Sequence, residues 1–185
     1  MQQLARADVE AAFREMGEIL YRARKTGEIA VFGGAAILLQ FETSFRTGDV
    51  DAIVQSGDHG AIMQAAADVA SRRGWLRSWF SEAVQNYVTK DARSAFHATY
   101  PSPDRPGLRV YVARPDYLLA MKLRAMRVGS RDEADAARLA RACGITTFAA
   151  MQALVASYFP REPISDRSLA IIAQFAGSLA HDPPA

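Results

Sequence analysis

The sequence predicts an α+β fold in which a mixed sheet flanked by helices occupies residues 1–113 and a helical portion packed on it occupies residues 114–181. Two observations predict this division. Short β-branched and aromatic runs, typical of strands, all lie before residue 113, and nearly continuous helical periodicity follows Arg114. We expect residues 182–185 to form a loose tail. At 185 residues, half of them hydrophobic, the chain is long enough to bury a substantial core.

Composition excludes several classes of protein. A charged fraction of 23% and a formal net charge of +2 are those of a globular chain, and this charge alone does not argue for nucleic-acid binding. The single cysteine, Cys143, excludes an intramolecular disulfide and fits a reducing compartment. No apolar run reaches about 18 residues, and the first residues lack a basic start followed by an apolar block. We therefore expect a cytoplasmic protein with no membrane partner.

The first half of the chain alternates helical and strand patterns. Apolar residues at helical spacing predict an amphipathic helix that ends near residues 25–27, with Gly27 as a left-handed cap. The run "IAVF" (29–32) predicts a strand stopped by Gly33 and Gly34, and "AAILLQF" (35–41) predicts a helix packed on it. "VDAIV" (50–54) predicts a second strand, and the segment 59–74 predicts a helix that ends at Gly74.

Residues 75–90 show no pattern that assigns them to a helix or a strand. "FHATY" (96–100) and "LRVYV" (108–112) flank the turn-forming stretch "PSPDRPG" and predict a β-hairpin. Four helical segments follow, at residues 115–129, 131–144, 147–159 and 166–180.

A pair of aspartates and a pair of glycines indicate a site. Asp49 and Asp51 are two residues apart in the expected strand, so their side chains should share a face of the sheet and repel each other. Mg²⁺ would remove this conflict, since it favours one or two carboxylates together with substrate phosphates. Gly33 and Gly34, between a strand and a helix, allow backbone N–H groups to approach a phosphate. Together these features predict a site for a metal-bound triphosphate. Taken separately, the aspartate pair also fits solvated charge at the edge of a strand, and the glycine pair also fits an ordinary turn.

Neighbouring polar residues extend this hypothesis. Arg46 and Thr47 precede the aspartates and are candidates to orient phosphate or metal ligands. Lys122 falls in the middle of an apolar helix face, where a lysine must reach solvent, form an internal ion pair or meet an anion such as a nucleotide phosphate. Asp135 lies close to the apolar stripe of the next helix. A contact between Lys122 and Asp135 would suit both a structural and a functional interpretation.

The stretch "VFGGAAILLQF…FRTGDVDAIV" resembles the first motif of the nucleotidyltransferase superfamily, in which a strand, a Gly-Gly or Gly-Ser pair and a later Asp-x-Asp bind NTP and Mg²⁺. The spacing is most similar to the AbiEii-like and DUF6036-type nucleotidyltransferases, small bacterial proteins of which many are linked to toxin–antitoxin or phage-defence systems. The later "KLRAMRVGSRDEADAARL" is similar to the downstream motif of that group.

The resemblance implies a nucleotidyltransferase-like sheet and an enzyme that transfers NMP from an NTP to a hydroxyl of RNA or protein, with a cognate toxin or antitoxin as a further partner. It implies catalytic roles for Asp49 and Asp51, which would hold Mg²⁺, and for Lys122 and Asp135. Nucleotide-binding roles would fall on the residues at the matching positions, which are Gly33, Gly34, Arg46, Thr47 and Lys122.

One part of the family pattern is missing. Many nucleotidyltransferases carry a third carboxylate on a later strand, whereas "LRVYVAR" (108–114) offers Arg109 and Tyr111 and no acid. Glu82, Asp91 or Asp135 could substitute. The alternative function is therefore a catalytically silent nucleotidyltransferase-like module that binds a partner protein. A purely structural helical adaptor would leave the aspartate pair unexplained.

Overall fold

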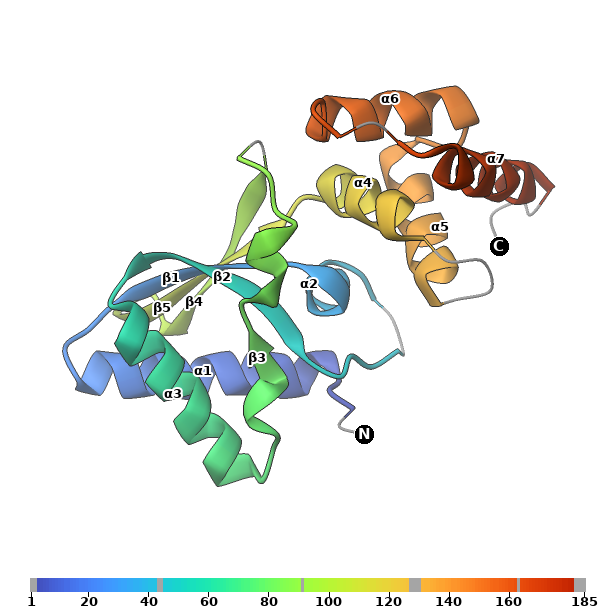
Figure 1. Ribbon diagram of the computed structural model, residues 1–185. Coiled ribbons are helices and arrows are strands. Elements are labelled where there is room, and N and C mark those ends of the chain that lie inside the picture. The colour runs from blue at the N-terminus through green and yellow to red at the C-terminus, as the bar shows by residue number, and fades with distance from the viewer. Residues whose placement is uncertain (1–2, 43–44, 91, 127–130, 163, 182–185) are drawn as a thin grey trace. The chain divides into compact units, whose positions relative to one another are not determined.

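The computed structural model describes residues 3–42, 45–90, 92–126, 131–162 and 164–181, and it confirms the α+β fold (Figure 1). A five-stranded mixed sheet packs against helices, and the C-terminal portion is helical. The chain forms two compact units. The sheet unit comprises Met1–Val88 and Ser94–Ala113, and the helical unit comprises Thr89–Arg93 and Arg114–Ala185.

The sheet unit contains three α-helices and five strands among its described residues. The order along the chain is α1 (Arg6–Arg22), β1 (Gly27–Val31), α2 (Gly33–Gln40), β2 (Val50–Gly57), α3 (His59–Arg73), η1 (Arg77–Trp79), β3 (Phe80–Ser81), η2 (Ala83–Asn86), β4 (Ser94–Ser102) and β5 (Arg105–Ala113). The strands lie in the order β3-β2-β1-β5-β4, and α1 and α3 lie on one side of the sheet (Figure 1).

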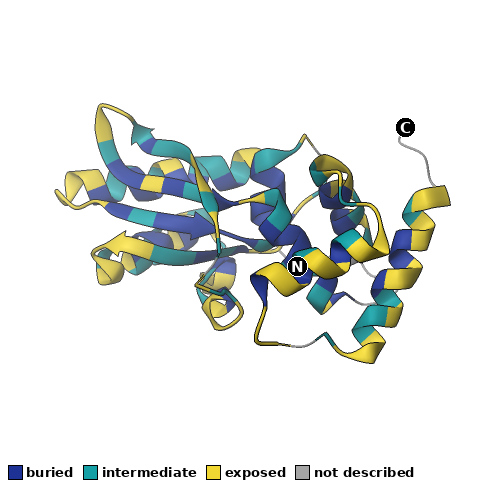
Figure 2. Ribbon diagram, turned by 90° about the horizontal axis from the view of Figure 1, so that it is seen from above, coloured by how far each residue is buried: buried dark blue, intermediate teal, exposed yellow. Residues whose placement is uncertain are grey.

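The central strand β1 sets the position of the site. It runs antiparallel to β2 and parallel to β5, with Val31 opposite Ala52 on one side and Val112 on the other. The carboxyl end of β1 therefore adjoins the amino end of β2. Ile29, Ala30 and Val31 are all buried, and Figure 2 shows buried residues along the strands of this unit.

Helix α1 has the amphipathic character that the sequence predicts. Val9, Phe13, Met16 and Leu20 are all buried on its inner face. The prediction of its end was wrong, because α1 stops at Arg22 and the residue with positive φ is Arg24 (φ 55°). Gly27 instead begins β1, where a Cβ would lie 2.5 Å from Cδ1 of Ile62, so packing explains this glycine.

The stretch without a clear pattern, residues 75–90, supplies the edge of the sheet. The two-residue strand β3 pairs in parallel with β2, which sets Ser81 opposite Asp51. Trp79 anchors this stretch, since its ring is buried and its Nε1–H donates to the Ala66 carbonyl at 2.9 Å. The expected hairpin is confirmed: β4 and β5 pair antiparallel.

The helical unit contains α4 (Pro115–Ala125), α5 (Arg131–Cys143), α6 (Phe148–Tyr158) and α7 (Asp166–His181). Two hydrogen bonds join Thr89–Arg93 to it: the Thr89 N–H donates to the Tyr117 hydroxyl at 2.9 Å, and the Arg114 N–H donates to the Arg93 carbonyl at 2.9 Å. In the described ranges no single helix is long and apolar enough to cross a membrane; α5 and α6 meet that test only as a pair bent by 93°.

Tyrosine ionisation predicts a loss of stability at alkaline pH. Burial, reinforced by a hydrogen bond to Asp116, raises the pKa of Tyr158 from 10.0 to about 12. The fold thus favours the neutral phenol, so this contribution to stability is present below pH 10.0 and is lost as the pH rises through about 12. Burial likewise raises the pKa of Tyr100 to about 12. In urea titrations across this range, Tyr158→Phe should lose stability less steeply than the wild type; equal slopes would contradict this assignment.

Candidate functional site

The glycine pair forms the start of α2 directly after β1. Gly33 has a φ of +60°, which favours glycine, and the preceding Phe32 gives the helix no side-chain cap. The first hydrogen bond of the helix joins the Ala36 N–H to the Phe32 carbonyl at 3.2 Å. Helix geometry leaves the N–H groups before Ala36 without a partner inside the helix. The first turn of α2 can therefore offer these donors to an anion.

Asp51 lies against this helix start. The Phe32 N–H donates to the Asp51 carbonyl at 2.8 Å, which ties the end of β1 to the beginning of β2. A Cβ on Gly33 would lie 2.8 Å from Asp51 Oδ2. A side chain at position 33 would therefore displace the carboxylate. The structure brings together the glycine and the aspartate that the sequence assigns to one site.

Thr47 holds the segment before the aspartates. It is 5% exposed, and its backbone exchanges hydrogen bonds of 2.7 and 2.9 Å with Leu4. Its Oγ1 donates to the Asp49 carbonyl at 3.1 Å, and a Cβ on Gly34 would lie 2.9 Å from that oxygen. Thr47 thus fixes the backbone at Asp49 and lies beside the second glycine of the pair.

Asp49 differs from expectation in one respect. Strand β2 begins at Val50, so Asp51 lies in the strand and Asp49 immediately before it. The alternation of side chains in a strand therefore applies to Asp51 and does not fix the direction of Asp49. Asp49 is exposed and Asp51 is half-buried, so the two carboxylates differ in their access to solvent.

Arg46 contacts the beginning of the chain. Its Nη1 lies 3.4 Å from the Gln3 carbonyl and 4.0 Å from Asp8 Oδ2, and its side chain is exposed. At this separation the contact with Asp8 is weak. Arg46 is one residue from Thr47 and so remains near the site, but its observed partners belong to the segment around the start of α1.

Lys122 and Asp135 form the contact that would suit both interpretations of these residues. In the helical unit, Lys122 Nζ lies 3.0 Å from Asp135 Oδ2 and joins α4 to α5. The two side chains are 18% and 7% exposed. This geometry is that of an internal ion pair, which accounts for a lysine on an apolar helix face. Participation of either residue in catalysis stays a prediction.

The candidates for a third carboxylate have other surroundings. Glu82 accepts a hydrogen bond from the Val54 N–H at 3.2 Å and pairs with His59 at 2.7 Å, and Asp91 lies outside the described residues. On β5, Arg109 pairs with Glu28 at 3.1 Å. Within the described part of the chain, no three His, Cys, Asp or Glu residues gather into a group that could hold a metal. Asp49 and Asp51 stay the candidate carboxylate donors of this site.

These donors fit Mg²⁺ bound together with a nucleotide. Mg²⁺ needs one or two protein carboxylates when substrate phosphates and water complete its coordination. Both glycines approach these groups closely, since a Cβ at Gly33 would lie 2.8 Å from Asp51 Oδ2 and a Cβ at Gly34 would lie 2.9 Å from Thr47 Oγ1. Sequence reasoning missed Ser81, which β3 sets opposite Asp51, because a two-residue strand has no periodic signal.

Comparisons of the chain with protein-family models, with curated proteins and with solved structures find no match.

Proposed function

We propose that the chain is a Mg²⁺-dependent nucleotidyltransferase that moves NMP from an NTP to a hydroxyl of RNA or protein. The observation that carries this proposal is the direct approach of Gly33 to Asp51, since a Cβ there would lie 2.8 Å from the carboxylate. Helix α2 begins with two glycines, which have no side chains, and it begins beside the carboxylate of β2. This arrangement suits a phosphate chain that binds together with a metal ion. The resemblance of the same residues to the first nucleotidyltransferase motif points to the same chemistry.

Each residue of the site has a role in this proposal. Asp49 and Asp51 would hold Mg²⁺, which supplies positive charge to the triphosphate when bound. The backbone N–H groups at Gly33 and Gly34 would orient the phosphates, and Thr47 would keep Asp49 in position. The acceptor hydroxyl would attack the α-phosphorus while the bond to pyrophosphate breaks, so positioning and charge neutralisation dominate catalysis.

The alternative is a catalytically silent module that binds a cognate protein in a toxin–antitoxin or phage-defence system. The composition of β5 favours it, because Arg109 and Tyr111 stand on the strand where the family pattern has an acid. An exposed aromatic side chain, Phe96, which is 59% accessible and lies 5.8 Å from the Tyr111 ring, adds an apolar contact point on the neighbouring strand.

A transfer assay tests the proposed activity. The chain is incubated with Mg²⁺, each NTP labelled at the α-phosphate, and either bulk RNA or a protein extract as acceptor. Asp51→Asn should lower the transfer of label about a hundredfold or more, because loss of a metal ligand affects both metal affinity and phosphate positioning. Asp58→Asn is the matched control, since Asp58 is an exposed carboxylate of the same unit that pairs with Lys25. Transfer by Asp51→Asn at the wild-type rate would contradict the assignment.

A further inference from the structure

A pocket of about 170 Å³ lies within the helical unit, at a place to which neither the sequence nor the proposed activity assigns a role. Its walls come from the segment around Thr89 and from the turn that follows α6. The lining residues are Thr89, Lys90, Tyr158, Phe159, Pro160, Arg161 and Glu162. A cavity of about 150 Å³ accommodates a benzene molecule, so this pocket has room for a phosphate group.

Thr89, which lines this pocket, has an unusual hydroxyl. Its Oγ1 is buried and has no hydrogen-bond partner among the described residues. Its backbone N–H is satisfied by the Tyr117 hydroxyl at 2.9 Å. Buried hydroxyls nearly always have a partner, and an exception calls for an explanation such as a missing ligand.

The charged residues of the pocket are predominantly basic. Lys90 and Arg161 are exposed, and neither forms an ion pair with a carboxylate in the part of the chain that the structure describes. The one acidic lining residue, Glu162, is paired with Arg124. The guanidinium of Arg124 in turn lies 4.2 Å from the centroid of the Phe159 ring, which holds this pair at the wall of the pocket. An anion in the pocket would therefore meet two available cations and a neutralised acid.

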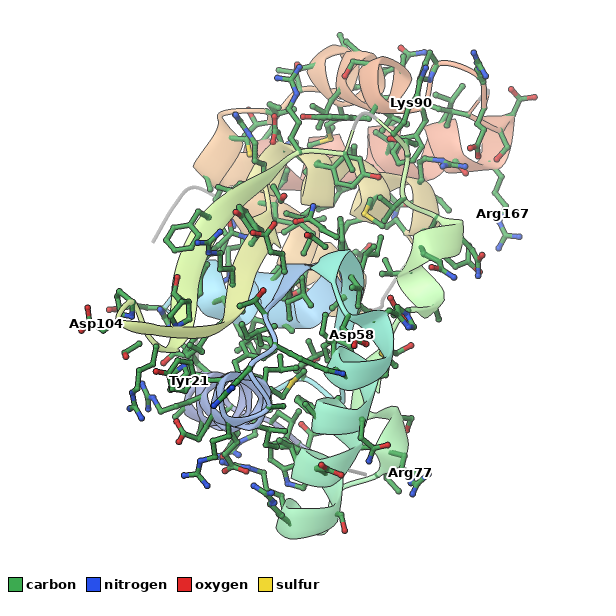
Figure 3. All side chains as sticks on the ribbon, turned by 90° about the vertical axis from the view of Figure 1, so that its left-hand side faces the viewer. Tyr21, Asp58, Arg77, Lys90, Asp104 and Arg167 are labelled. Carbon is green, nitrogen blue, oxygen red and sulfur yellow. The ribbon has the colours of Figure 1, made fainter. Side chains whose placement is uncertain are left out.

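We propose that this pocket binds a phosphate group, with Lys90 and Arg161 as its charged contacts and the Thr89 hydroxyl as a third donor after rotation of its side chain. Arginine and lysine both bind phosphate oxygens, and a tetrahedral anion accepts several donors at once. The proposal does not depend on the transfer activity, because all of its residues lie in the helical unit. Lys90 is labelled in Figure 3, as is Arg167, an exposed arginine that does not line the pocket.

Amide chemical shifts of the full chain test this proposal. Inorganic phosphate is added at constant ionic strength against chloride, so that general screening is matched. We expect saturable shifts at Thr89, Lys90, Tyr158, Phe159, Arg161 and Glu162 that Arg161→Gln weakens, whereas shifts at Gly33 and Asp51 report on the separate site of the sheet unit and should not respond to that substitution. Arg161→Gln should weaken the phosphate Kd about tenfold, and Thr89→Val roughly fivefold. Arg167→Gln is the matched control and should bind like the wild type.

Thr89→Val gives a second, independent measurement. Because the hydroxyl lacks a partner, its replacement by a methyl group should leave the phosphate-free protein as stable as the wild type or more so. Destabilisation by Thr89→Val would overturn the proposal, as would equal shifts with chloride or an unchanged Kd in Arg161→Gln. A short oligoribonucleotide then distinguishes the sources: tighter binding with the same shifts identifies a nucleic-acid phosphate, and binding of phosphate alone identifies a small phosphate ester.

Discussion

Asp135→Ala should lower the free energy of unfolding of the helical unit by about 3 kcal/mol. The substitution leaves the Lys122 ammonium, whose side chain is 18% exposed, without the carboxylate that lies 3.0 Å away. Removing one member of a buried ion pair is costly because the remaining charge is poorly solvated. Hydrogen exchange of peptides from α4 and α5 measures the effect. Fluorescence of Trp75 and Trp79, which both lie in the sheet unit, should report no change.

The double variant Lys122→Met/Asp135→Leu separates the charge from the packing. It should recover stability to within about 1 kcal/mol of the wild type, because well-packed apolar residues often replace a buried pair without loss. A double variant as unstable as Asp135→Ala would contradict this account. Its transfer activity tests the role that the resemblance implies for Lys122: poor transfer by a stable double variant supports that role, and full transfer assigns the pair to folding alone.

Gly107→Ala should destabilise the sheet unit by about 3 kcal/mol, at the upper end of the usual cost of overpacking. A Cβ at this position would collide with the Gly17 carbonyl oxygen and lie 2.9 Å from the Tyr21 nitrogen, both in the backbone of α1. Gly17 is constrained by the other strand of the hairpin, since its Cβ would lie 2.5 Å from the Tyr100 carbonyl carbon in β4. The helix must move away from the hairpin, because backbone atoms cannot rotate aside as a side chain can.

Urea unfolding followed by tryptophan fluorescence measures this effect in the sheet unit. Gly60→Ala in α3 is the matched control, because its Cβ would lie 3.5 Å from Asp58 Oδ1, an ordinary contact. It should be neutral or add up to about 1 kcal/mol from the better helix propensity of alanine. Equal stability of Gly107→Ala and Gly60→Ala would show that α1 can move aside at no cost, against the close packing described above.

Local patterns in the sequence were sufficient to predict much of the fold. The helical spacing from Val9 to Leu20 and the turn-rich stretch between the hairpin strands each carry a periodic or conformational signal, and both elements are present. The parallel pairing of β1 with β5 could not be read in this way, because it joins Val31 to Val112 across most of the sheet unit. The place of Thr89 in the helical unit could not be predicted from local patterns either, because it depends on a hydrogen bond to Tyr117.

In the candidate site, too, local sequence patterns predict some features, whereas others depend on contacts between distant parts of the sequence. Gly33 and Asp51 lie together because β1 and β2, the strands on either side of α2, pair antiparallel. The local motifs predict that both residues belong to one site, although they do not predict this pairing. The ion pair of Lys122 with Asp135 follows from two apolar helix faces that each carry a charge. The burial of Thr47 depends on backbone hydrogen bonds with Leu4, which is far away in sequence, so no local pattern predicts it.

Nucleotide-dependent stability of the sheet unit is the most direct test of the proposed site. Thermal unfolding is followed by tryptophan fluorescence with Mg²⁺ and each of the four NTPs, for the wild type and for Asp49→Ala/Asp51→Ala. An NTP at about 100 times its Kd should add roughly 2.7 kcal/mol to the wild type and nothing to the double variant. No stabilisation by any NTP, or equal stabilisation of both proteins, would contradict a Mg²⁺–nucleotide site at Gly33 and Asp51.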